Sequence, residues 1–225
     1  MKHDMDGPAD TRMMGIVHEA LRRDLRRLHD ALSRAPYPDG ERRTALAAHA
    51  AWMMTFLHHH HGTEDSGLYP MVRAKNPAAA DLLDVMDADH KRVLPAMERL
   101  EEAARRWGLS GSDADRIAVL SSIDDLQTVL VPHLEREETE MMPVVARSIT
   151  HREWHAWNQK NNIRAKKLSQ LAEEGNWLID DLDPERRKIV EAEVPVVPRY
   201  VVLYGFGPSY RKRAALRWGT GVTRG

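Results

Sequence analysis

Residues 57–70, LHHHHGTEDSGLYP, and residues 133–143, HLEREETEMMP, decide the fold that this sequence predicts. Each stretch contains a His-x-x-x-Glu pair with a proline six residues after the glutamate, and the matching residues of the two stretches are 73 positions apart. A further pair, His18 and His90, is separated by 72 positions. The chain therefore contains one internal repeat, whose unit is a helix with one histidine, a turn, and a helix with His-x-x-x-Glu.

Apolar residues around these motifs recur at alternating intervals of three and four, which is typical of amphipathic helices. Short turns at residues 35–40 and at Asn76-Pro77 separate the helical stretches. The sequence predicts an all-α fold, an antiparallel up-down four-helix bundle of two pseudo-repeated helix pairs. Pro132 either kinks the fourth helix or precedes its start. The four apolar stripes are Met14, His18, Leu21, Leu25, Leu28 and Leu32; Leu46, Ala50, Met53, Leu57, His60 and Glu64; Leu83, Met86, His90, Val93, Met97 and Leu100; and Ile123, Leu126, Leu130, His133, Glu137 and Met141.

The histidines and glutamates of the repeat lie on the apolar face of each predicted helix. A buried polar side chain needs a partner, and residues at positions i and i+4 lie on the same side of a helix. A single core histidine is more often hydrogen-bonded than metal-bound, but six residues that obey one repeat favour two metal ions. Because the chain has no cysteine, nitrogen and oxygen must be the ligand atoms, and these suit iron or manganese. The candidate ligands are His18, His60, Glu64, His90, His133 and Glu137.

The segments 57–70 and 133–143 resemble the hemerythrin-like, or HHE cation-binding, family, and the resemblance covers roughly residues 12–149. It implies a four-helix bundle that holds two iron ions joined by an oxo or hydroxo bridge. The four histidines named above then correspond to iron ligands, and Glu64 and Glu137 to the carboxylates that bridge the ions. Manganese and zinc are the alternative metals.

Two departures from the oxygen-carrying hemerythrins bear on function. Those proteins have a fifth histidine one helical turn from the third-helix ligand, where this chain has Met86 and Leu94. They also place an aspartate five residues after the last histidine, whereas Glu137 follows His133 by four. A centre with one histidine fewer is more open. This favours binding or turnover of oxygen, peroxide or nitric oxide, as in a di-iron oxidoreductase, over reversible oxygen carriage.

Two other functions compete with this interpretation. One is an iron, oxygen or redox sensor that signals through the C-terminal extension without turnover. The other is a structural role, in which the metals mainly hold the bundle together, so that their loss unfolds it. The expected partners are a small diatomic or peroxide ligand and a redox partner, and the sequence leaves the oligomeric state open.

The remaining polar residues near the motifs are predicted to lie outside the metal centre, because the register that places His60 inward turns its neighbours away. A second metal site at the C-terminal histidine pair is not favoured, because that pair lacks a carboxylate in register. Near the motifs, His58, His59 and His61 are predicted to be outer or solvated side chains, and Asp65 a surface or outer residue. Glu138 and Glu140 are predicted to be surface charges, and the C-terminal pair is His151 with His155.

Composition and the terminal segments predict where the protein is located and how the chain divides into segments. The formal charge of −1 indicates no particular partner, and no apolar leader or membrane span is visible, so a cytoplasmic protein is expected. The predicted divisions are a mobile segment 1–10, the bundle 11–149 and a C-terminal extension 150–225. Within the extension, residues 151–174 are predicted to be helical, Gly175 to break the helix, and Asp183-Pro184 to open a second helix that ends near Glu193.

The tail from Val194 to Gly225 combines several aromatic residues with six basic residues and no acidic one. This combination can mark nucleic-acid binding. Packing of the aromatic residues on the bundle, with the basic residues against its acidic surface, is the favoured interpretation, so nucleic acid is not an expected partner. The basic residues are Arg199, Arg211, Lys212, Arg213, Arg217 and Arg224.

Overall fold

The structure is a computed structural model that describes residues 4–194 and 199–219. Over these ranges the ordered elements are helices, apart from one isolated β-bridge between Pro8 and Thr150. The predicted all-α class is therefore confirmed. Of the helices in the described residues, none has the length together with the apolar character needed to cross a membrane.

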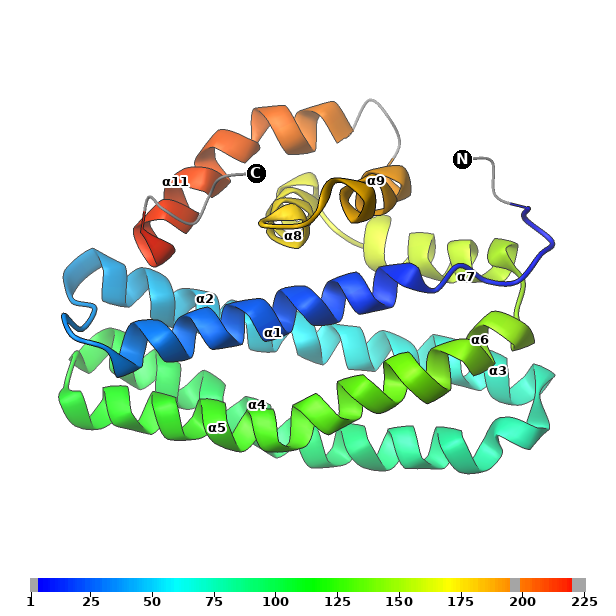
Figure 1. Ribbon diagram of the computed structural model, residues 1–225, viewed down its shortest axis with the longest axis horizontal. Helices are drawn as coiled ribbons and strands as arrows, with labels where there is room; N and C mark the ends of the chain where they lie inside the picture. The colour runs from blue at the N-terminus through cyan, green and yellow to red at the C-terminus, as the bar shows by residue number, and fades with distance from the viewer. Residues whose placement is uncertain (1–3, 195–198, 220–225) are drawn as a thin grey trace.

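Four long helices form an elongated antiparallel bundle (Figure 1). In this view α1 and α2 lie above α4 and α5, and each helix runs opposite to the next one along the chain. Short helices extend α2 and α5 beyond the point where the metal-ligand candidates lie. The elements are α1 Arg12–Ser33, α2 Gly40–Thr63, η1 Glu64–Leu68, α3 Tyr69–Lys75, η2 Pro77–Ala79, α4 Ala80–Ser110, α5 Asp113–Arg136, η3 Glu137–Met141 and α6 Met142–Ser148.

The turn between α4 and α5 shows how local sequence sets helix ends. Gly111 has a φ of +63°, which a residue without Cβ adopts at little cost, and its N–H donates to the carbonyl of Trp107. The Ser112 side chain then accepts a hydrogen bond from the backbone N–H of Asp115 and caps α5. Pro132 lies inside α5, so it does not precede the start of that helix.

Both copies of the repeat widen into a π-helical turn at the glutamate of the motif. In η1 the backbone N–H of Tyr69 donates to the carbonyl of Glu64, and in η3 the N–H of Met142 donates to that of Glu137. Such turns insert an extra residue into a helix and are frequent at functional sites. The repeat seen in the sequence is therefore also a repeat of backbone geometry.

The bundle interior contains two apolar clusters, and along α2, α4 and α5 the chain passes from one cluster to the other at or beside the candidate ligands. The larger cluster gathers residues such as Leu25, Leu57 and Leu100, and the smaller one gathers residues such as Leu68, Met86 and Met141. The apolar stripes predicted from the sequence supply most of both clusters. The metal-ligand candidates thus form a polar layer between two apolar parts of the core.

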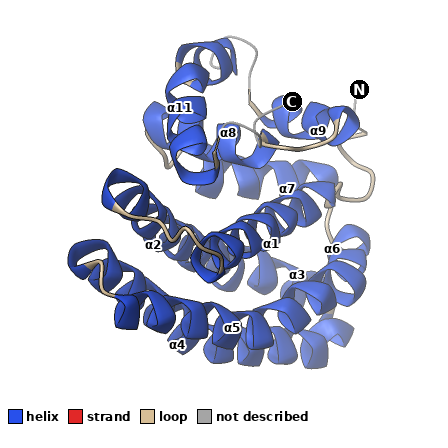
Figure 2. Ribbon diagram, turned by 60° about the vertical axis from the view of Figure 1, so that its left-hand side comes forward, coloured by secondary structure: helices blue, strands red, loops and turns tan. Residues whose placement is uncertain are grey.

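The C-terminal extension packs against the α1 and α2 side of the bundle, away from α4 and α5 (Figures 1 and 2). The predicted single helix over 151–174 is interrupted at residues 164–167, and Gly175 lies inside a helix instead of ending one. A Cβ at Gly175 would lie 3.4 Å from Cγ1 of Val202, so the small residue allows close packing. The elements are α7 His151–Asn158, η4 Gln159–Ile163, α8 Leu168–Ile179, α9 Pro184–Glu193, η5 Val201–Gly205 and α11 Gly207–Trp218.

The helix predicted to open at Asp183-Pro184 is confirmed as α9. The Asp183 side chain accepts hydrogen bonds from the backbone N–H groups of Glu185 and Arg186, and Pro184 occupies the first turn, where its missing N–H costs nothing.

A buried polar network around Asp24 joins the extension to the bundle. The Asp24 carboxylate, fully buried on α1, accepts hydrogen bonds from His49 Nε2 of α2 at 2.7 Å and from the indole N–H of Trp177 of α8 at 3.0 Å. Arg23 Nε donates to the same carboxylate at 2.8 Å. Burial raises the pKa of Asp24, but the hydrogen bond from His49 and the charge of Arg23 outweigh it and hold that pKa well below its usual range.

The interpretation of the aromatic tail is confirmed in part. Tyr210 is buried, and the Trp218 ring meets His49 of α2 edge-on, with ring centroids 5.5 Å apart. Tyr200 and Phe206 are exposed, and Arg213 pairs with Glu173 of α8 within the extension. Arg224 lies outside the described residues, as does the side chain of Tyr204.

The described part of the N-terminal segment follows the start of α7. The backbone N–H of His151 donates to the carbonyl of Gly7 at 2.9 Å, that of Arg152 donates to Met5 at 2.8 Å, and Ala9 is buried. Residues 1–3 lie outside the described part of the chain.

Candidate metal centre

The structure brings all six predicted ligand residues together in the polar layer of the bundle. Each residue is buried, and both glutamates are 0% exposed. The six residues come from all four bundle helices and from the π-helical turns that follow α2 and α5. The group therefore assembles only when the four helices pack together. The residues are His18 of α1, His60 of α2, Glu64 of η1, His90 of α4, His133 of α5 and Glu137 of η3.

The donor atoms form two neighbouring groups. In one, ligand atoms of His18, His60 and Glu137 lie within 4.8 Å of one another; in the other, those of His61, His90 and His133 do. Three donors at this mutual distance can surround a single ion. The bundle thus contains two adjacent sets of donors, as two metal ions would require.

Glu64 lies between the two groups. Its Oε1 is 3.2 Å from His60 Nε2, and its Oε2 is 3.8 Å from His90 Nε2. One carboxylate therefore presents an oxygen to each group, which is the geometry of a bridging ligand.

Glu137 also faces both groups, through one oxygen. Its Oε2 is 3.3 Å from His18 Nε2 and 3.8 Å from His133 Nε2. Its Oε1 instead accepts a hydrogen bond from the buried Tyr69 hydroxyl at 2.8 Å. Tyr69 has no counterpart in the repeat, since position 142 is methionine, so sequence reasoning did not single it out.

The inward-facing atoms of these residues have no hydrogen-bond partner among the described residues. Buried polar atoms are normally paired, and an unpaired group costs about 1–3 kcal/mol, so a cluster of them needs an explanation. Divalent cations would satisfy all of them at once, and the donor set of imidazole and carboxylate suits iron. The atoms are Nε2 of His18, His60, His61, His90 and His133, both side-chain oxygens of Glu64, and Oε2 of Glu137.

Burial shifts the pKa values of Glu64, His60 and His133 towards their neutral forms. Burial, reinforced by the charge of Glu137, raises the pKa of Glu64 well above its usual range. Burial also lowers the pKa of His60 to about 3 and that of His133 to about 4. At His18 and Glu137 burial is outweighed by the close contact between the imidazole and the carboxylate, which raises the pKa of His18 and lowers that of Glu137. Neutral imidazole is the form that binds metal, and a nearby cation favours ionised Glu64.

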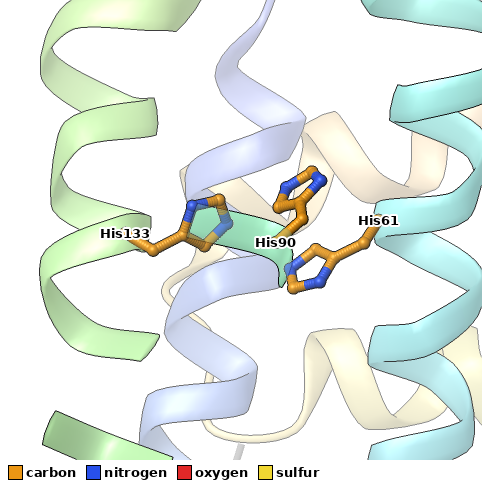
Figure 3. Close-up of side chains that lie close together, drawn as sticks. All are labelled: His61, His90 and His133. Carbon is orange, nitrogen blue, oxygen red and sulfur yellow. The ribbon is translucent and has the colours of Figure 1, made fainter. Parts of the chain in front are cut away.

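The prediction that His61 faces away from the centre is wrong. The His61 side chain is buried, and its ring stacks on that of His90 with centroids 4.1 Å apart, while the His133 ring lies 5.0 Å away (Figure 3). The side of α2 that packs inward is wide enough for two consecutive histidines. A signal was available: Met54, Leu57 and His61 form a second stripe at intervals of three and four, and both apolar members are buried.

Two carboxylates orient the histidine rings from outside. Glu138 Oε1 lies 2.8 Å from His18 Nδ1 and also accepts from Arg22, so the prediction that Glu138 is only a surface charge is wrong. Asp65 Oδ1 lies 2.8 Å from His90 Nδ1, which agrees with its predicted outer position. Since a ring that donates from Nδ1 presents Nε2 as the acceptor, both contacts set the tautomer needed to bind metal.

We expect Glu138→Ala to weaken metal binding by about 10- to 100-fold, because His18 loses the carboxylate that orients its ring. Competition with a chelator would measure the change. Glu140→Ala is the matched control, because Glu140 lies in the same π-helical turn and is exposed. Equal metal retention in the two variants would contradict this role.

A family model described as the hemerythrin HHE cation binding domain matches residues 10–145, more than half of the chain. The matched range contains the six residues of the two donor groups and also Glu64. Comparison with curated proteins gives no match, and comparison with solved structures gives none either.

Proposed function

This chain belongs to the hemerythrin HHE cation-binding domain family, and on that premise we propose that it holds two iron ions and binds or turns over a small oxidant. The oxidant would be oxygen, peroxide or nitric oxide. The observation that carries the proposal is the layer of buried, unpaired donor atoms, arranged as two groups with Glu64 between them. A metal-binding role for the domain agrees with both the family and the donor groups.

In the proposed arrangement His18 and His60 would hold one ion, and His61, His90 and His133 would hold the other. Glu64 and Glu137 would each supply a carboxylate to both ions. The distances from Glu64 to His60 and His90 support the first bridge, and those from Glu137 to His18 and His133 support the second.

The inward position of His61 changes the expectation that the centre has one histidine fewer than the oxygen-carrying hemerythrins. The sequence lacks a histidine one turn from His90, which favoured an unusually open centre. A fifth imidazole lies beside His90 all the same, because α2 supplies it. A missing ligand therefore no longer supports turnover over simple binding.

Bound iron would supply one-electron transfer and an open coordination position for the oxidant. The protein residues contribute the surroundings. The carboxylates of Asp65 and Glu138 fix the orientation of two histidines, and the Tyr69 hydroxyl donates to Glu137. The apolar clusters beside the polar layer surround the centre with carbon and so lower the local polarity around it.

Metal analysis and an optical spectrum of the purified protein, followed by addition of hydrogen peroxide, test the proposal. We expect about two irons per chain with oxo-bridge absorption, and sustained oxygen release if the protein is a peroxide-consuming enzyme. Protein that contains no iron when purified and takes up none would contradict the di-iron proposal.

A sensor is the second candidate, and one observation favours it. The extension packs against α1 and α2, the helices that carry His18 and His60. A change at the metal centre could therefore reach the extension directly. A spectral response that is stoichiometric with the oxidant, without turnover, would favour this function.

We expect His61→Leu to lower the iron content from about two towards about one per chain, because the second ion loses one of three imidazoles. His58→Leu is the matched control, since His58 lies on the same helix and is exposed. Metal analysis and the optical spectrum would measure the loss. Full occupancy in His61→Leu would show that His61 is a packed core residue and not a ligand.

A further inference from the structure

A cavity of about 100 Å³ lies between the bundle and the C-terminal extension, outside the polar layer. Its walls come from α1, α2, η4 and four other segments, so it exists only because the extension covers the bundle. His60 lines it, and the Phe56 ring, also in the wall, lies nearly parallel to the His60 ring with centroids 6.2 Å apart. The cavity therefore reaches the edge of one metal-ligand candidate.

The walls are mainly apolar and include aromatic rings. Cavities lined by carbon atoms hold water poorly even when several waters would fit. They bind small apolar molecules such as benzene instead. Pockets for larger organic ligands measure about 300–1,000 Å³, so the available volume limits the occupant to a single ring. The apolar wall residues include Met14, Val17, Phe56, Trp154, Trp157, Leu171 and Leu178.

One ion pair marks the polar end of the cavity. Lys166 Nζ donates to Glu174 Oε2 at 2.6 Å, and the two side chains are 10% and 18% exposed. Lys166 Nζ also lies 5.7 Å from the centroid of the Phe56 ring. An ammonium has three donors and a carboxylate several acceptor positions, so the pair retains capacity for one more polar group.

The charges of Lys166 and Glu174 cancel, and the third charged side chain of the wall, Glu193, accepts a hydrogen bond from Asn158, so the wall has no excess positive charge that would attract an anion. A further buried charge would be uncompensated, whereas a hydroxyl can accept from Lys166 and donate to Glu174 without adding charge. The other uncharged polar side chains of this part of the wall are Asn158, which donates to Glu193, Asn162, which donates to Asn158, and His59, whose Nε2 is buried without a hydrogen-bond partner among the described residues. Burial also raises the pKa of Glu174, so the cavity does not favour a second anion.

From this geometry we propose that the cavity is a binding site for a neutral, single-ring phenol, whose ring lies among the apolar walls with its hydroxyl on Lys166 and Glu174. The site is separate from the metal centre but shares the His60 edge with it. It does not depend on the identity of the metal or on turnover, so it can be tested whether or not the di-iron proposal holds.

Binding of phenol, toluene and benzoate to the full-length protein, measured by calorimetry, tests the proposal. We expect phenol to bind at least tenfold more tightly than toluene, which lacks the hydroxyl, and than benzoate, which carries a charge. The same order is expected after the metal is removed with a chelator. Equal binding of phenol and benzoate, or no saturable binding of phenol, would overturn the proposal.

Variants locate the site. Leu171→Trp should fill the cavity and weaken phenol binding at least tenfold, whereas Leu168→Trp should not, because Leu168 lies on the same helix but is exposed and does not line the cavity. Lys166→Met should remove most of the preference of phenol over toluene and leave toluene binding unchanged. Thermal unfolding of each variant verifies that it is folded. Unchanged phenol binding in a folded Leu171→Trp variant would place the phenol elsewhere and overturn the assignment.

Discussion

Replacing Glu64 by alanine is expected to lower the metal content to well below about one ion per chain. Glu64 directs one oxygen towards each donor group, so its loss removes a ligand from both proposed ions. The remaining histidines would then hold two cations with one fewer negative charge between them. Because loss of an outer contact alone costs about 10- to 100-fold in affinity, loss of a bridging ligand should cost more than 100-fold.

Metal analysis after purification, and titration of the metal-free variant with ferrous iron, would measure this effect. Glu135→Ala is the matched control, because Glu135 lies two residues from His133 on the outside of α5 and is exposed. If Glu64→Ala retained about two irons per chain at the affinity of the parent protein, Glu64 would not be a bridging ligand.

Replacing Asp24 by alanine is expected to lower the free energy of unfolding by about 3–5 kcal/mol, because removing one partner leaves buried charges and donors without an acceptor. The donors left behind are the Nε of Arg23, the Nε2 of His49 and the indole N–H of Trp177. Since Trp177 belongs to the extension, the variant should also loosen the contact between the extension and the bundle.

Denaturant unfolding would measure the free energy, and limited proteolysis would detect a loosened extension. Asp30→Ala is the matched control, because Asp30 lies on the same helix, is exposed, and makes an ion pair with Arg34 at 3.4 Å. An exposed pair of this kind contributes about 0–1 kcal/mol. A similar small effect for Asp24→Ala would contradict the role assigned to the network.

Much of the fold and most of the candidate metal centre could be predicted because both depend on periodicity within single helices. His60 and Glu64 share a face of α2 by their spacing alone, and the offset of 73 residues predicts the same of His133 and Glu137. The α9 start at Asp183-Pro184 is local in the same way, since its cap satisfies backbone groups within the first turn.

The contacts that each helix face makes with other helices depend on tertiary packing and could not be predicted from periodicity. His61 is inward because α2 packs against more than one helix, so its buried side is wider than one stripe. Glu138 contacts His18 across 120 residues of sequence, and Asp24 meets Trp177 across 153, distances over which no local pattern operates. Gly175 lies inside α8 beside Val202 of η5, a neighbour that is distant in the sequence.

The sequence by itself thus determined which side chains each helix presents to the core, because that follows from 3.6 residues per turn. The tertiary structure decided how those side chains combine into two donor groups, an outer set of carboxylates and a cavity under the extension. Such combinations depend on the packing of helices that are distant in the chain, and helical periodicity contains no information about that packing.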